Sequence, residues 1–226
     1  MVVRLLIGNK VKWSEKSFCI PGRNAEKTIY KINLTMQEER IISGHNEEEV
    51  WRQLQQDLTQ NSDLLQYRAQ INQQNKIIHL DIDIDLGGGF EGGYATTIFS
   101  AAFRNRDRFR FAIHEEGFFD DLGKFFGMQD VVIGYPDFDK AFIIKTNDES
   151  RVRTIFTDDE ARNVLLTLKD FTFEIVLTEP DNDVDEEGND SMLELVIEEG
   201  ITDPVILRKL YRVFFGTLNL IDPFSL

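Results

Sequence analysis

The sequence predicts an α+β protein with a mostly antiparallel sheet packed against several amphipathic helices. Three observations lead to this fold class. Apolar and polar residues alternate strictly over residues 78–85, within the expected strand 76–86, which is the period of a half-buried strand. Strand-like segments follow one another in adjacent pairs, whereas in βαβ units a helix would separate each strand from the next. Apolar residues recur at helical spacing elsewhere, most clearly at 158–169.

The expected strands are runs of aliphatic, β-branched and aromatic residues between turn signals. Residues 76–86 would place one apolar and one polar face on either side of the sheet, and residues 67–71 would pair with them across the amide-rich turn 72–75. Further strands are expected at 2–7, 28–34, 131–133, 141–145, 151–156, 171–177 and 192–197, and at 94–103 and 109–113, which would form a hairpin around the charged turn 104–108.

The expected helices are marked by capping residues as well as by apolar spacing. Asn46 can cap the free amide of Glu49 at the start of a helix over residues 46–60. Thr157 and Glu160 have the spacing of a capping box before residues 158–169. Two more helices are predicted, one between Gly117 and Gly127 and one that opens with Asp203 and Pro204 and ends near Gly216 or Leu218.

Length and composition favour a single α+β domain over residues 1–226. The chain is 42% hydrophobic, so it can bury a sizeable core without disulfides or metal. If an internal boundary exists, the amide-rich turn 72–75 is the best candidate, with N-terminal strands and a helix in 1–75 and the main sheet in 76–226.

The charge balance restricts the classes of partner. Forty acidic and 25 basic residues give a formal net charge of −15, which repels phosphate backbones and anionic lipid heads. We therefore expect neither nucleic acid nor membrane as a partner, and a basic protein as the favoured one. The single cysteine, Cys19, excludes an internal disulfide, and neither a signal peptide nor a membrane span is recognisable. A soluble, cytoplasmic protein is the expectation.

The glycine-rich segment after residue 86 has the formal spacing of a dinucleotide fingerprint at Gly87, Gly89 and Gly92. The context argues against this, because residues 94–103 favour a strand where a helix is required, and the preceding strand carries acids along one face. The kinase and phosphate-loop patterns also fail at their defining positions. We expect no cofactor.

A metal site is likewise not expected. Asp81, Asp83 and Asp85 form an oxygen row, but a calcium loop would need glycine and glutamate where Leu86 and Gly92 stand. No histidine has a histidine or cysteine three or four residues later. The three aspartates could instead face four alternating arginines if the two strands are neighbours. The arginines are Arg104, Arg106, Arg108 and Arg110.

Two other groups are candidates for a functional surface beside these aspartates. His114 and Glu115 stand at the end of a predicted strand, where an imidazole beside a carboxylate could act as an acid or base. The segment 179–190 contains seven carboxylates and no basic residue, which is typical of an exposed hairpin loop or of a docking surface for a basic protein. Its central acids are Asp181, Asp183 and Asp185.

The stretch 131–176 is similar to a bacterial domain family of unknown function, in which a Phe-Asp/Glu-Lys-x-Phe strand leads through a short turn to a strand and a helix. The matching residues are Pro136, Phe138, Asp139, Lys140 and Phe142, then 151–156, Arg162 and Leu165. The resemblance covers about a fifth of the chain. It implies a bacterial α+β domain and assigns no catalytic residue. Members often carry membrane segments, which are not recognisable in this sequence.

Two functions remain in view. The first is a non-enzymatic binding or scaffold module whose acidic surface contacts a basic partner, of which an immunity-like protein that neutralises a cationic toxin is one form. The alternative is a hydrolase or transferase that uses carboxylates and His114 in a cleft assembled by the fold. The sequence indicates neither an oligomeric state nor a ligand.

Overall fold

The computed structural model describes residues 39–60, 64–88, 92–115, 127–177 and 191–223. Every described residue belongs to one compact unit within residues 37–226. Several predictions therefore lie outside the described residues: the strands at 2–7 and 28–34, the helix between Gly117 and Gly127, and the acidic segment 179–190 with Asp181, Asp183 and Asp185.

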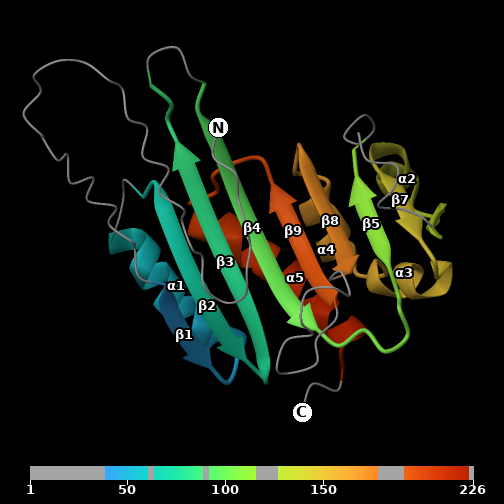
Figure 1. Ribbon diagram of the computed structural model, residues 1–226, viewed down its shortest axis with the longest axis horizontal. Coiled ribbons are helices and arrows are strands. Elements are labelled where there is room, and N and C mark those ends of the chain that lie inside the picture. Colours follow the sequence, from blue (N-terminus) through green and yellow to red (C-terminus); the bar gives the residue numbers. More distant parts are fainter. Residues whose placement is uncertain (1–38, 61–63, 89–91, 116–126, 178–190, 224–226) are drawn as a thin grey trace, which may run out of the picture. The chain divides into compact units, whose positions relative to one another are not determined.

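The described residues form one sheet of nine strands in the order β1-β2-β3-β4-β9-β8-β5-β7-β6 (Figure 1). All neighbours are antiparallel except β1 and β2, which run parallel. The predicted α+β class with a mostly antiparallel sheet is confirmed. The strands are β1 (Arg40–Gly44), β2 (Gln66–Gln73), β3 (Lys76–Asp85), β4 (Tyr94–Phe103), β5 (Phe111–His114), β6 (Gln129–Asp130), β7 (Ile143–Thr146), β8 (Phe171–Leu177) and β9 (Ser191–Ile197).

Helices α1, α4 and α5 lie behind the strands in Figure 1, on one face of the sheet. Their apolar side chains and the alternate inward side chains of the strands make the core. Among the helices that the structure describes, none is long and apolar enough to cross a lipid bilayer. The helices are α1 (Glu47–Gln60), α2 (Pro136–Ala141), α3 (Glu149–Ile155), α4 (Asp159–Leu165) and α5 (Pro204–Ile221).

One row of buried side chains crosses five neighbouring strands. Strand register places Leu80 beside Phe99 and Phe99 beside Leu195, and the row continues through Phe173 to Ile113. All five side chains are at most 1% exposed. Because fully burying one such side chain stabilises a fold by roughly 1.5–3 kcal/mol, rows of this kind fix which face of each strand is turned toward the helices.

The predicted hairpin between residues 94–103 and 109–113 is wrong. Both segments contain strands, but β9 and β8 lie between β4 and β5 in the sheet. The predicted pairing of strand acids with Arg104 to Arg110 fails for the same reason. Asp81 instead pairs with Arg68 on neighbouring β2, at 2.9 Å.

The predicted strand at 151–156 is also wrong, because this segment forms helix α3. Asp148 caps the helix by accepting a hydrogen bond from the amide of Arg151 at 3.1 Å. Val152 and Ile155, three residues apart, are buried on one side of it. Two further strands are displaced: the one expected at 131–133 is β6 at 129–130, and the one expected at 141–145 is β7 at 143–146, preceded by helix α2.

The predicted capping box before α4 is one residue out of place. Asp158 is the cap, and its carboxylate accepts from the amide of Glu160 at 2.9 Å. The hydroxyl of Thr157 donates to the carbonyl of Arg153 instead. The helix ends at Leu165, earlier than the predicted 169. By contrast, the predicted caps Asn46 and Asp203 of α1 and α5 are confirmed.

The residues that carry the resemblance over 131–176 have local structural roles. Phe138 is buried, with its ring centroid 4.9 Å from that of Phe142. The carboxylate of Asp139 accepts hydrogen bonds from the amides of Ile133 and Gly134 and so fixes the loop before α2. These contacts give the two phenylalanines and Asp139 a role in folding. The segment with Phe138 to Lys140 is helix α2, whereas the family pattern implies a strand there.

Candidate functional site

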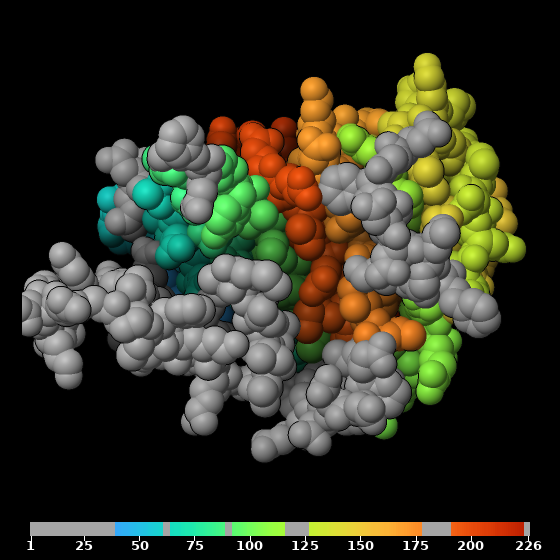
Figure 2. Space-filling view, turned by 45° about the horizontal axis from the view of Figure 1, so that its top comes forward, coloured from blue at the N-terminus to red at the C-terminus, as the bar shows by residue number. Residues whose placement is uncertain are grey.

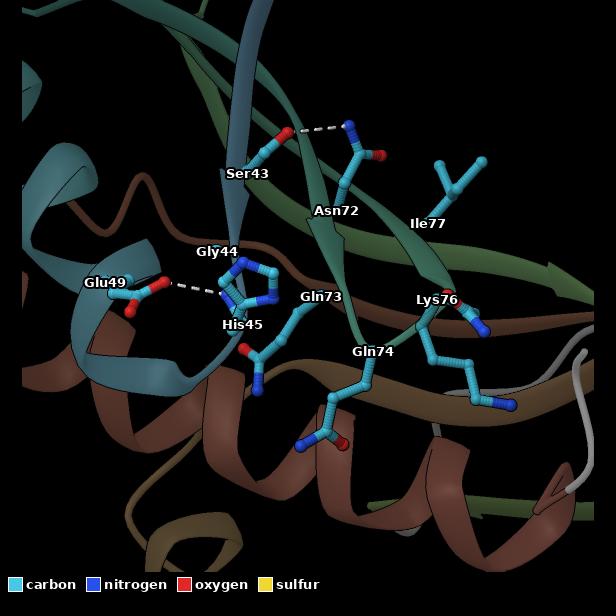
Figure 3. A pocket seen from close by; sticks show the side chains of 10 residues that line it. Ser43, Gly44, His45, Glu49, Asn72, Gln73, Gln74, Lys76 and Ile77 are labelled. Atoms are coloured by element: carbon cyan, nitrogen blue, oxygen red, sulfur yellow. Dashed lines mark hydrogen bonds between the residues drawn. The ribbon is translucent and has the colours of Figure 1, made fainter.

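A pocket of about 630 Å³ opens between the β1–α1 connection and the β2–β3 turn (Figure 3). One wall comes from the end of β1 and the first turn of α1, and the other from the end of β2 and the start of β3. The lining residues are Ser43, Gly44, His45, Glu49, Asn72, Gln73, Gln74, Asn75, Lys76 and Ile77. The pocket is therefore unusually rich in side-chain amides.

The β2–β3 turn is tight, and its sequence suits it. Gln74 and Asn75 have positive φ values of 49° and 62°, which a two-residue hairpin of type I′ requires of both central residues. Asparagine tolerates this left-handed conformation better than most residues. The turn leaves both side chains exposed at the rim, with no hydrogen bond to any described residue.

The opposite wall depends on a close approach at Gly44. A Cβ atom there would lie 2.9 Å from the Cβ of Glu49 and 3.0 Å from the amide of Val50, so only glycine lets β1 turn directly into α1. Asn46 then accepts from the amide of Glu49 at 3.0 Å, and Glu49 accepts from the amide of His45 at 2.8 Å. The first turn of α1 is thus capped by two hydrogen bonds from backbone amides to side-chain oxygens, in a variant of the capping box.

Gln73 contributes a buried amide to the pocket. Its side chain is 4% exposed, and its Oε1 accepts a hydrogen bond from the hydroxyl of Tyr211 on α5 at 2.6 Å. Burial, together with the nearby charge of Glu47, raises the pKa of Tyr211. The hydroxyl therefore stays protonated at neutral pH and can act as the donor in this bond.

The charged groups of the lining are engaged with other parts of the protein. Lys76 is buried, and its ammonium lies 2.7 Å from a carboxylate oxygen of Asp222 and also donates to the carbonyl of that residue. Glu49 is used in the cap of α1. The imidazole of His45 is exposed and makes no hydrogen bond to a described residue. Hydrogen bonding, and not a fixed charge, is what the pocket can offer a ligand.

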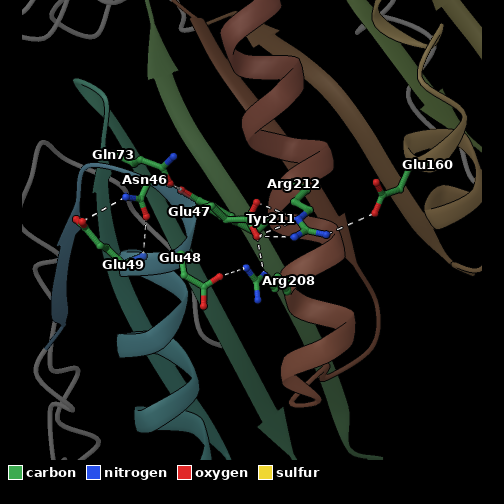
Figure 4. A network of polar contacts seen from close by, with 9 residues as sticks. All are labelled: Asn46, Glu47, Glu48, Glu49, Gln73, Glu160, Arg208, Tyr211 and Arg212. Atoms are coloured by element: carbon green, nitrogen blue, oxygen red, sulfur yellow. Dashed lines mark hydrogen bonds and ion pairs between the residues drawn. The ribbon is translucent and has the colours of Figure 1, made fainter.

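An ion-pair network holds the α1 wall against α5 (Figure 4). Glu47 lies 2.6 Å from Arg208 and 2.9 Å from Arg212, and Glu48 lies 2.6 Å from Arg208. Arg212 also reaches Glu160 on α4, at 3.6 Å. Partial burial would raise the pKa of Glu47, but its two arginine partners outweigh this and lower it. The network therefore positions the first turn of α1.

The aspartates singled out in the sequence lie on β3 and outside the pocket. Asp81 pairs with Arg68, and Asp85 accepts from the amide of Gly87 at 2.9 Å. Asp83 accepts hydrogen bonds from side chains on both neighbouring strands, namely Gln66 and Tyr94. Each carboxylate thus has a structural role, and their part in a functional surface stays a prediction.

His114 and Glu115 lie far from these aspartates. Three strands separate β5 from β3, so His114 and Asp81 are about 19 Å apart at the usual spacing of strands. His114 is 2% exposed, and its Nδ1 is 2.8 Å from the carbonyl oxygen of Glu115. Burial, reinforced by the charge of Lys145, lowers the pKa of His114. Glu115 itself is half-buried.

The structure also assembles a polar row that the sequence analysis missed. Strand register places Glu174 opposite Glu194, then Glu194 opposite Ser100, and Ser100 opposite His79. The row crosses β8, β9, β4 and β3 on the face turned away from the helices. Figure 2 shows the orange and red surfaces of β8 and β9 running side by side across that face. The available signal was a single glutamate in each of two largely apolar strands.

Within the described residues, no three histidine, cysteine, aspartate or glutamate side chains are placed to hold a metal ion. No known protein family matches the chain, and no curated protein matches its sequence. Function must therefore be argued from the geometry of the pocket.

Proposed function

We propose that the protein is a non-enzymatic binding module that receives a segment of a basic protein partner in the amide-lined pocket. The observation that carries this is the chemistry of the lining, which offers hydrogen bonds while its lysine is engaged with Asp222 and its glutamate with the α1 cap. A volume of about 630 Å³ suits a few residues of a partner chain.

Charge supports a basic partner. The formal net charge of −15 attracts cationic proteins over distances of about one Debye length, roughly 8–10 Å in physiological salt. The three acids beside the pocket, Glu47 to Glu49, are held in ion pairs with α5 or in the cap of α1, so this attraction comes from the net charge as a whole. An immunity-like role, neutralising a cationic toxin, is one form of this function.

The enzymatic alternative has less support. It requires carboxylates and His114 in one cleft, whereas Asp81 and His114 stand on strands about 19 Å apart. The pocket contains neither residue. In the lining, the hydroxyl of Ser43 accepts a hydrogen bond from the amide of Asn72 and donates none to His45 or Glu49, which would be needed to activate it.

The test is affinity capture with a rim variant and a matched control. Gln74→Lys adds a positive charge at the pocket, whereas Gln56→Lys makes the same change at an exposed position on α1 that is not part of the lining. We expect wild type and Gln56→Lys to retain a stoichiometric basic partner that dissociates in high salt, and Gln74→Lys to lose it. Equal capture by both variants would place the partner elsewhere, and a neutral or acidic salt-resistant partner would contradict the proposal.

A further inference from the structure

Resting on that proposed function, we infer that the pocket selects a side-chain amide, of glutamine or asparagine, within the basic segment of the partner. The residue that determines this selection is Gln73, whose amide group is buried, oriented and turned toward the pocket. Figure 3 shows its side chain extending between His45 and Gln74.

The orientation of Gln73 follows from its contact with α5. A glutamine side chain has one acceptor oxygen and a nitrogen with two donor hydrogens. Tyr211 donates to the oxygen at 2.6 Å, which leaves the nitrogen as the group available to a ligand. No described residue accepts a hydrogen bond from that nitrogen, although the side chain is 96% buried and lines the pocket.

The remaining lining favours an amide over a charged group. Gln74 and Asn75 add two more exposed amides that make no hydrogen bond to a described residue. Amides pair reciprocally, since each group donates and accepts at once, whereas a carboxylate can only accept and an ammonium can only donate. A carboxylate would also approach Glu49 while the lysine of the pocket is paired with Asp222, so the local charge opposes an anion.

The deciding experiment uses the isotope-labelled full chain and three capped tripeptides, Lys-Gln-Lys, Lys-Glu-Lys and Lys-Leu-Lys, followed by NMR. The backbone amides of Gly44, His45 and Asn75 and the side-chain amide of Gln73 report binding at the pocket. Because one or two added hydrogen bonds change affinity severalfold each, we expect the glutamine peptide to bind about tenfold more tightly than the leucine peptide. The glutamate peptide should be the weakest of the three.

Two variants separate selection from folding. Tyr211→Phe removes only the hydroxyl and keeps the ring that stacks on Phe215, so the preference for glutamine should fall below about threefold while the spectrum of the core is kept. Gln73→Leu should abolish the preference. If either variant fails to fold, the comparison of the three peptides on wild type still decides the matter.

The outcomes distinguish this inference from the proposed function. Equal shifts at the pocket with all three peptides would overturn amide selection and leave a basic partner at the pocket standing. Shifts only outside the pocket, or none, would also overturn amide selection, and the capture experiment with Gln74→Lys would then decide the proposed function by itself. An unchanged preference in Tyr211→Phe would remove Gln73 from the role assigned to it.

Discussion

The two ends of the sheet are stabilised by different interactions. Around β5, β7 and β8, phenylalanine rings contact one another in a continuous series, with Phe111 touching Phe109, Phe156 and Phe173 at centroid distances of 5.4–5.9 Å. Around β1, β2 and β3, the links between elements include ion pairs and amides, such as Lys76 with Asp222. The phenylalanine contacts are thus concentrated at one end of the sheet, whereas at the end that carries the pocket ion pairs and amides add to an aliphatic core.

The largest effect should come from the phenylalanine-rich end. Phe111→Ala removes a ring with no exposed surface and should lower the free energy of unfolding by about 3–5 kcal/mol, because a cavity replaces three ring contacts. Ile41→Ala, at a side chain that is 69% exposed on β1, should change it by less than about 0.5 kcal/mol. Urea unfolding measures both, and a similar loss in the two variants would contradict the role of the buried ring in stability.

The second effect should be smaller and should depend on salt. Glu47→Gln weakens two ion pairs between α1 and α5 and should cost about 1 kcal/mol at low ionic strength, where exposed and half-buried pairs contribute most. In about 1 M salt the cost should shrink, whereas that of Phe111→Ala should not. Glu48→Gln, which weakens a single separate pair with Arg208, is the matched control and should cost less.

The third prediction concerns pH at the phenylalanine-rich end. Burial lowers the pKa of His114 below its ordinary value of 6.5, so the unfolded chain binds this proton more readily than the folded one. Stability from this group is therefore present above pH 6.5 and is lost as the pH falls from there toward the folded pKa. His114→Gln should flatten the pH dependence in that window when unfolding is measured across it. An equally steep dependence in the variant would assign the effect to another group.

The smallest effect should come from the aspartates of β3. Asp81→Asn weakens an exposed pair with Arg68 and should cost about 0.2–1 kcal/mol, less in high salt. Asp83→Asn keeps one oxygen for Gln66, and its new amide nitrogen can donate to the hydroxyl of Tyr94, so the change should be closer to neutral. A loss of several kcal/mol on thermal or urea unfolding would show that these acids do more than stabilise the strand locally.

Helices and strands were predicted correctly where the local sequence pattern fits only one type of secondary structure. The alternation in β3 could fit only a half-buried strand, and Asn46 and Asp203 could be read as caps from their positions alone. The helix α3 was missed although Val152 and Ile155 have helical spacing, because the short run also resembled a strand. Asp148 in front of it was the unused signal.

Long-range pairing could not be predicted in the same way. Nothing in residues 94–113 indicates that β9 and β8, which follow more than fifty residues later, lie between β4 and β5. The pocket could not be predicted for the same reason. Gly44 and Gln74 come from segments that meet only because β1 pairs in parallel with β2. The sequence did contain a signal for one wall of the pocket. Four consecutive residues from Asn72 to Asn75 carry side-chain amides, although a tight turn needs only two residues.

The parallel edge strand β1 has a consequence for how the molecule opens. Among the described strands its one neighbour is β2, and the chain connects the two through α1, so β1 and α1 can detach together while the antiparallel strands stay paired. We expect their backbone amides to exchange with solvent sooner than those of β8 and β9. Such an opening separates Gly44 from Gln74 and dismantles the pocket. A bound segment would hold both together, so occupancy should slow hydrogen exchange most at this edge.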